Sequence, residues 1–243
     1  MPADESRSLA TSFASYSATL HGTVGLGYAP VGGERAFALG DRTGGVAWST
    51  SKVPLAIAAL RAVPVAAKPF VTPTITRSDN AAAERLWSML GPPDVAAAAV
   101  QAVLEEGGDT GTRVQSRRVR PEYTAFGQTE WSTTRQALFT AHLPCIEAGA
   151  EVLALMRTLD PEQRWGLARL PGAAAKGGWG PDEQGAHLVR QLGVLPNGSG
   201  WTAVVLGARP SSGTFADGIA LLDQLTQWVD SHLRQLPAGR CQR

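Results

Sequence analysis

The segment STSKVPLAIAALR, residues 49–61, decides the fold of this 243-residue chain. Apolar residues recur at helical spacing from Val53 to Leu60, and Pro54 lies near the start, where a first-turn proline is tolerated. The segment therefore predicts a helix with Ser49 at its N-terminus.

Ser49 and Lys52 form an S-x-x-K motif at the start of this helix. Side chains three residues apart share one helix face, and the helix N-terminus favours negative charge developing on the serine. The pair is therefore a candidate nucleophile with an amine beside it.

Two further motifs follow in the order that such a site requires. Ser78-Asp79-Asn80 is an S-D-N, and Lys176-Gly177-Gly178 stands on a predicted strand where a K-T-G would be. All but three of the 22 Lys and Arg residues are Arg, the third Lys being Lys68. A buried Lys can lose its proton whereas Arg cannot, so lysines kept within motifs indicate proton-transfer chemistry.

The composition limits the possible partners. With 44% hydrophobic and 18% charged residues and a net charge of +1, the chain has the profile of a compact globular protein, and we expect no nucleic-acid partner. No apolar run reaches the length of a membrane span, and residues 1–20 lack a signal-peptide pattern. We expect a cytoplasmic protein as the chain stands, or an exported one if a signal peptide was removed.

Other common sites are missing from the sequence. There is no G-x-S-x-G and no P-loop, and the four His residues are too far apart to pair as ligands, so we expect no metal and no cofactor. Cys145 and Cys241 lack metal or redox spacing. We expect two unpaired thiols, with a single disulfide as the alternative.

Strand patterns occur near both chain ends and helical patterns between them. The predicted strands cover residues 23–29, 35–39, 173–179, 187–195 and 201–208. The predicted helices cover residues 9–20, 50–61, 81–90, 94–106, 132–142, 148–159 and 215–233. This order predicts an α+β fold: an antiparallel sheet lobe from residues 1–50 and 171–243, with terminal helices and an inserted helical lobe from 51–170. The long loop over residues 107–130 is typical of a functional segment.

In this order, the three motifs resemble those of the penicillin-recognising serine acyltransferases, most closely the class A β-lactamase-like branch. The segment ITRSDNAAAERL (75–86), the helix start over 131–143 and Arg164-Trp165-Gly166-Leu167 are also similar to that family. The resemblance covers nearly the whole chain and implies the two-lobed β-lactamase-like fold.

The resemblance also implies roles for individual residues. Ser49 would be the acylated nucleophile, Lys52 would take or relay its proton, and Ser78 would pass a proton to the leaving nitrogen. Asn80 would hold a substrate amide and Lys52, while Lys176 would support Ser78 and attract a substrate carboxylate. The backbone N–H groups of Ser49 and Trp179 would form the oxyanion hole. For Asp79 we expect a helix-capping role.

The sequence departs from the family pattern at the third motif and at the expected water-activating Glu. Gly177, Gly178 and Arg190 are candidate substrate-binding residues, although Gly177 lacks the hydroxyl with which a Thr or Ser at that position would bind a substrate carboxylate. No E-x-x-L-N supplies the water-activating Glu, which leaves Glu122 and Glu130 as candidate bases.

An arginine cluster at residues 117, 118 and 120 lies in the same long loop. It is interpreted as a solvated or structural cluster, or alternatively as a site for an anionic substrate.

We expect a serine hydrolase that forms an acyl-enzyme at Ser49 with a small-molecule or peptide substrate carrying an amide, lactam or ester bond. Because no motif secures a base, deacylation should be the slow step. The alternatives are a D,D-peptidase-like or penicillin-binding activity, or a non-catalytic binding protein that retains the fold. The sequence leaves the oligomeric state open.

Overall fold

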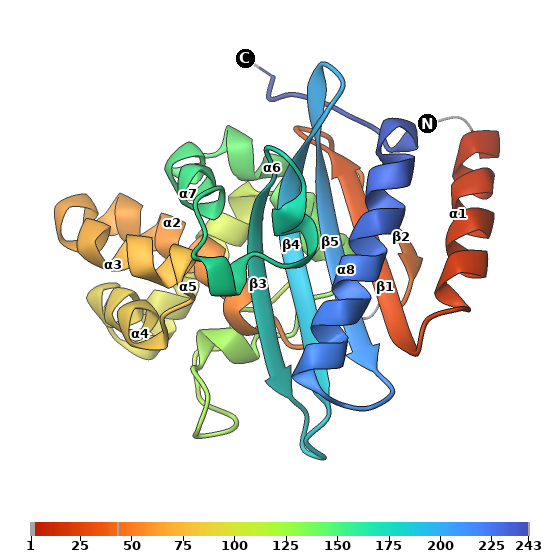
Figure 1. Ribbon diagram of the computed structural model, residues 1–243. Coiled ribbons are helices and arrows are strands. Elements are labelled where there is room, and N and C mark those ends of the chain that lie inside the picture. Colours follow the sequence, from red (N-terminus) through yellow and green to blue (C-terminus); the bar gives the residue numbers. More distant parts are fainter. Residues whose placement is uncertain (1–2, 43, 243) are drawn as a thin grey trace.

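The computed structural model describes residues 3–42 and 44–242, which form a five-stranded antiparallel sheet with helices on both faces (Figure 1). The strands are β1 (Gly22–Pro30), β2 (Phe37–Gly40), β3 (Ala174–Pro181), β4 (His187–Asn197) and β5 (Gly200–Pro210). Their order is β2-β1-β5-β4-β3, so segments from the two chain ends pair at β1 and β5, and β3 is an edge strand. The predicted α+β fold with a sheet from both chain ends is confirmed.

The helices divide between the two faces of the sheet. The N-terminal helix α1 (Ala3–Ser17) and the C-terminal helix α8 (Phe215–His232) lie on one face (Figure 1). The chain between β2 and β3 covers the other face with α2 (Lys52–Ala62), α3 (Pro64–Thr76), α4 (Asn80–Met89), α5 (Pro93–Glu106), α6 (Thr133–His142) and α7 (Gly149–Met156). Short 3-10 turns are η1 (Trp48–Ser51), η2 (Phe126–Gln128), η3 (Leu143–Cys145), η4 (Pro161–Gln163), η5 (Gly166–Arg169) and η6 (Leu233–Gln235).

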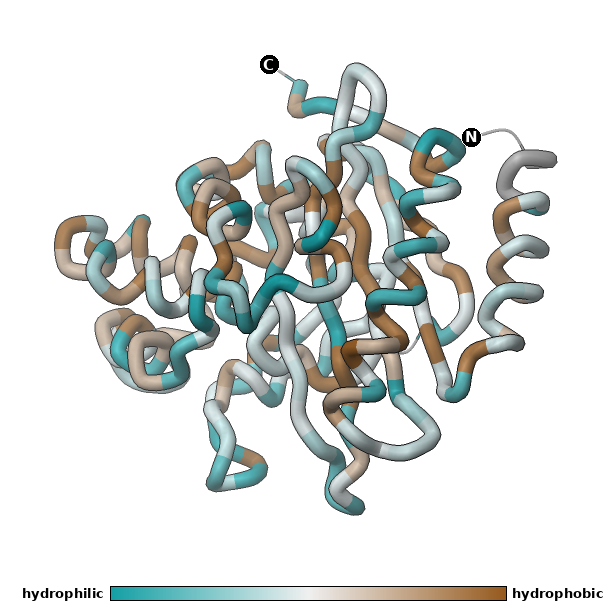
Figure 2. The backbone as a smooth tube through the Cα atoms, in the orientation of Figure 1, coloured by the Kyte–Doolittle hydropathy of each residue, from teal (hydrophilic) through white to brown (hydrophobic). Residues whose placement is uncertain are grey.

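Two hydrophobic clusters hold these layers together. Neighbouring residues of a strand point to opposite faces, so Val205 of β5 joins the cluster under the middle helices, while Val204 and Leu206 join the cluster under α1 and α8. Figure 2 shows the hydrophobic residues running along the strands and on the sides of α1 and α8 that face them. The central strands are thus buried on both faces, which makes the sheet a rigid base for the site.

Helix α3 has no counterpart among the sequence predictions. Pro69 and Pro73 lie inside it, and an internal proline removes a backbone hydrogen bond. Ala67, Val71 and Ile75 recur every four residues and are all buried against the helical core. Tertiary packing therefore maintains a helix that its prolines disfavour.

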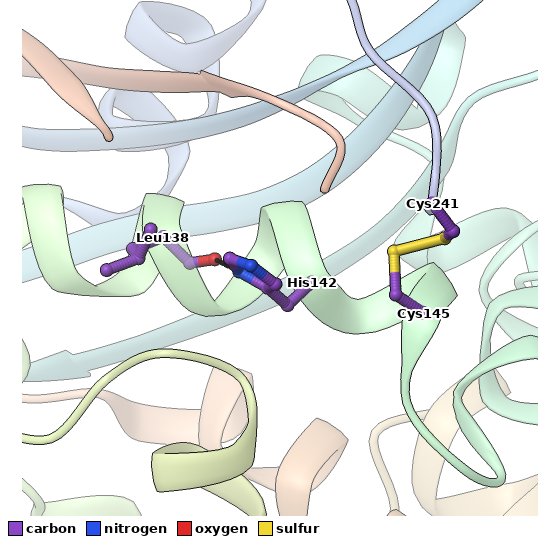
Figure 3. The surroundings of a disulfide bond; sticks show 4 residues. All are labelled: Leu138, His142, Cys145 and Cys241. Carbon is purple, nitrogen blue, oxygen red and sulfur yellow. Dashed lines mark hydrogen bonds between the residues drawn. A yellow bond between two sulfur atoms is a disulfide. The ribbon is translucent and has the colours of Figure 1, made fainter. Parts of the chain in front are cut away.

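The two cysteines form a disulfide, so the expectation of two unpaired thiols is wrong. Cys145 and Cys241 are 96 residues apart in sequence, but their Cα atoms are 5.3 Å apart (Figure 3). The C-terminal tail runs back beside β5, where Gly239 pairs with Trp201, and this brings Cys241 to the end of η3. The spacing of the two cysteines in the sequence does not reveal that the C-terminal tail runs back to η3.

Candidate active site

Ser49 lies in the turn η1, directly before α2, as the S-x-x-K motif predicts. The hydroxyls of its neighbours point back into the protein: Thr50 Oγ1 donates to Ala47 O (2.5 Å) and Ser51 Oγ donates to Trp48 O (2.6 Å). Ser49 is half-buried and lines a cleft, and its Oγ has no hydrogen-bond partner in the part of the chain that the structure describes. Among the hydroxyls of Ser49, Thr50 and Ser51, that of Ser49 is therefore the one that faces the cleft.

The backbone is strained at two positions of the site. Trp48, directly before Ser49, has φ = 49°, and Ser78 of the S-D-N has φ = 58°. Residues other than glycine rarely adopt this left-handed region, and such strain concentrates where function fixes a conformation. Both strained residues border the same cleft.

Lys52 connects the first two motifs. Its side chain is 1% exposed, and Nζ donates to Asn80 Oδ1 (2.7 Å), to Ser78 Oγ (3.3 Å) and to Ser78 O. Burial lowers the pKa of Lys52 to about 7, although the charge of Asp79 acts in the opposite direction. Lys52 can therefore be a neutral amine near neutral pH, as a proton acceptor must be.

Lys176 connects the third motif to the second. It is 1% exposed on β3, and its Nζ donates to Ser78 Oγ (2.9 Å) and to Gly177 O (2.7 Å). Burial, followed by the charge of Lys52, lowers its pKa well below the usual value. Ser78 Oγ thus accepts from both lysines, in an arrangement suited to passing a proton between them.

Asp79 and Asn80 are placed by the start of α4. The Asp79 carboxylate accepts from the backbone N–H of Ala82 (2.9 Å), so the expected N-cap role is confirmed. This cap orients the first turn of α4 so that Asn80 reaches Lys52.

Ser49, Ser78 and Asn80 border one cleft of about 440 Å³. It is lined by Trp48, Ser49, Ser78, Asn80, Ala81, Glu84, Arg118, Glu122, Tyr123, Thr124, Gly127, Trp179, Gly180, Pro181 and His187. It therefore brings together η1, α4, β3, the start of β4 and the long loop over residues 107–130.

The long loop is fixed by two buried side chains that the sequence analysis did not single out. The carboxylate of Asp109 accepts from the N–H groups of Gly111 and Thr112 and from Trp131 Nε1 (2.8 Å). Gln128 accepts from the backbone N–H of Arg120 (2.7 Å) and donates to three loop carbonyls. The loop is thus held as a defined wall of the cleft.

The two candidate bases occupy different places. Glu122 lines the cleft, pairs with Arg120 at 3.3 Å and has a 56% exposed side chain. Glu130 does not line it: its backbone pairs with Val46, and it borders a neighbouring cavity of about 490 Å³. Of the two, Glu122 is the one that borders the same cleft as Ser49. Glu84, on α4 one turn after Asn80, lines the cleft and was missed, because it lies outside the S-D-N itself although within the segment 75–86.

Two side chains of the arginine cluster, Arg118 and Arg120, contact other groups of the protein. Arg118 Nη2 pairs with Glu84 Oε1 (2.8 Å), while Arg120 donates to Pro181 O (2.5 Å) and lies over the Tyr123 ring. These contacts favour the structural interpretation over an open anion site.

Arg190 does not contact the cleft, which corrects its assignment to substrate. It is 1% exposed and donates to the carbonyls of Gly45, Val46 and Trp131 and to Gln136 Oε1 (2.6 Å). Gln136 in turn donates to Thr50 Oγ1 (2.8 Å). Arg190 is therefore linked to the η1 turn through Gln136.

The glycines of the third motif permit close packing. A Cβ on Gly178 would lie 2.8 Å from the backbone N of Ser49, so only glycine lets β3 approach η1 this closely. A Cβ on Gly177 would lie 2.4 Å from the Trp165 ring, which fills the space that a Thr of a K-T-G would need. Neither glycine lines the cleft, so their expected substrate contact is not supported, while Trp179, the second expected oxyanion donor, does line it.

Within residues 3–42 and 44–242, no group of three or more His, Cys, Asp or Glu side chains is arranged to hold a metal ion. In the same part of the chain, no single helix has the length and apolar character needed to cross a membrane. One pair bent by 107°, Thr133–Cys145 with Gly149–Met156, passes that test by length and composition only.

Solved structures with this architecture match at TM-scores well above the level of chance. A β-lactamase from Xanthomonas campestris pv. campestris has a TM-score of 0.68 at 18% identity, over 94% of this chain and 98% of that one. The TLA-3 extended-spectrum β-lactamase has a TM-score of 0.71 at 15% identity, over 94% and 99%. The chain has the class A β-lactamase fold.

A β-lactamase from Sphaerobacter thermophilus extends this similarity, with a TM-score of 0.69 at 20% identity over 96% of this chain and 99% of that one. Neither a protein-family model nor a curated protein sequence matches the chain. The β-lactamase fold is thus recognisable here from its structure and from short motifs.

Proposed function

We propose that the protein is a serine hydrolase that is acylated at Ser49 by an amide, lactam or ester substrate. The observation that carries this proposal is Ser78 Oγ, which accepts from both Lys52 Nζ and Lys176 Nζ at the cleft that Ser49 lines. A hydroxyl between two buried amines has no evident structural purpose, whereas proton transfer to a leaving nitrogen requires such a relay.

The proposed reaction uses these groups in order. Neutral Lys52 takes the proton of Ser49 Oγ, directly or through one bridging water, as the oxygen attacks the carbonyl carbon. The backbone N–H groups of Ser49 and Trp179 stabilise the negative charge on the carbonyl oxygen. Ser78 then protonates the leaving nitrogen and regains a proton from the lysines.

A penicillin-binding or D,D-peptidase-like activity is the second candidate, and the disulfide favours it. Disulfides persist in oxidising compartments, where peptidoglycan stems would be accessible. Such an enzyme would be acylated by penicillin without rapid turnover. A non-catalytic binding protein with this fold would not be acylated at all.

Labelling with a fluorescent penicillin and with a fluorophosphonate probe tests the proposal. Either hydrolase should become covalently fluorescent with at least one probe, and Ser49→Ala should abolish the label. Lys68→Arg, on the exposed side of α3, is the matched control and should label like the wild type. Labelling that persists in Ser49→Ala, or is absent from the wild type with both probes, would refute the proposal.

A further inference from the structure

We propose that the Glu84 carboxylate, held by Arg118, activates the water that releases the acyl group from Ser49. This inference rests on the proposed function and assigns its second half-reaction. The long loop, where the sequence led us to expect the base, places both Arg118 and Glu122 on the cleft wall. A guanidinium cannot accept a proton, and the Glu122 side chain is 56% exposed.

Glu84 reaches the cleft from the helix that carries the S-D-N motif. It is four positions after Asn80, so the two side chains lie on one face of α4, about 6 Å apart along the helix axis. Asn80 is bonded to Lys52 Nζ at 2.7 Å, and both Asn80 and Glu84 line the cleft. The face of α4 that carries Glu84 is therefore the face that meets the catalytic lysine.

The ion pair with Arg118 leaves half of the carboxylate free. Arg118 Nη2 contacts Glu84 Oε1 at 2.8 Å, and Glu84 Oε2 accepts no hydrogen bond from the described residues. A carboxylate fixed by one oxygen can hold a water with the other. The Glu84 side chain is 33% exposed, compared with 56% for Glu122, so Glu84 is the more enclosed of the two cleft carboxylates.

The step balances without any further reactant. Water oxygen attacks the ester carbonyl carbon of acyl-Ser49 while one water proton passes to Glu84. The tetrahedral intermediate collapses by breaking the bond between the carbonyl carbon and Ser49 Oγ. The serine oxygen takes back the proton that Glu84 holds, directly or relayed through Lys52, which leaves a free carboxylic acid and the original enzyme.

The test separates acylation from deacylation in one experiment. Protein is acylated with benzylpenicillin and, separately, with p-nitrophenyl acetate, excess reagent is removed, and adduct decay is followed by intact mass. Glu84→Gln should be acylated within about threefold of the wild type, whereas its adduct should last about 10²-fold longer, the lower end of the effect of losing a general base. Glu106→Gln, which breaks the surface pair with Arg61, is the matched control and should decay like the wild type.

Hydroxylamine distinguishes lost water activation from a disturbed cleft. As a strong nucleophile it should release the acyl group from wild type and Glu84→Gln at similar rates. Slow release by hydroxylamine from the variant, unchanged adduct decay, or a longer lifetime in Glu122→Gln alone would overturn the role of Glu84. If wild-type protein forms no adduct with either reagent, the proposed function itself fails, and this inference fails with it.

Discussion

The acylation rate should follow the ionisation of Lys52. The structure buries this amine at 1% exposure, which lowers its pKa to about 7. Only the neutral amine can accept the Ser49 proton, so the acylation rate should rise as pH increases through this value and then reach a plateau.

The expected change is large. With a pKa of about 7, the neutral fraction of Lys52 is about 90% at pH 8 and about 1% at pH 5, so the rate should fall about 90-fold between these values. An ordinary lysine, with its pKa near 10.4, would instead give a rate that climbs about tenfold per pH unit up to pH 10.

The measurement is the rate of covalent labelling by a fluorescent penicillin from pH 5 to pH 10, in quenched samples. Because the charge of Asp79 raises the pKa of Lys52, Asp79→Asn should move the midpoint to lower pH while keeping a side chain that caps α4. Lys52→Arg should reduce the rate about 10²–10⁴-fold and Lys68→Arg should not. A rate still rising above pH 9, or a Lys52→Arg variant as fast as the wild type, would refute the reasoning.

Three further predictions concern stability. Reducing the Cys145–Cys241 disulfide, which closes a loop of 96 residues, should lower the free energy of unfolding by about 3–5 kcal/mol in urea titrations, and a Cys145→Ser, Cys241→Ser double variant should not respond to reductant. Gly177→Ala should lower stability by about 1–3 kcal/mol because its Cβ meets Trp165, and an unchanged unfolding midpoint would contradict that packing. Arg190→Met should cost about 1–3 kcal/mol for each of the two carbonyls, Val46 O and Trp131 O, that it leaves without a partner, and it should also slow labelling; a variant with normal stability would show that this buried network is dispensable.

Periodic sequence patterns predicted most of the fold. All five strands and the helices other than α3 appear near their expected positions, because alternating and helical hydrophobic spacing reports directly on burial. Helix α3 was missed because its prolines argue against a helix and only contacts with the distant core stabilise it. The disulfide was missed for a related reason, since a contact between distant segments leaves no local signal.

The sequence likewise predicted some residues of the candidate site and missed others. Ser49, Lys52, Ser78, Asn80 and Lys176 stand in motifs, so their convergence follows from the sequence once the fold is known. Side chains that act across the cleft belong to no motif, and their identity depends on geometry. Nothing in the sequence distinguishes Glu84 from other surface residues of a helix, and its ion pair with Arg118 becomes known only from the structure. Arg190 was a wrong prediction of the opposite kind. Its position on the strand after Lys176 suggested contact with substrate, but its side chain is buried and bonded to Gln136.

We expect Ser49 to be acylated and the acyl group to be released from it slowly. The most direct test is a time course of intact mass with benzylpenicillin, followed by peptide mapping of the modified protein. We expect a rapid gain of one penicillin, located on the peptide that contains Ser49, and then slow decay with a burst in the hydrolysis trace. An unaltered mass, an adduct on another residue, or fast turnover with no detectable adduct would contradict the account.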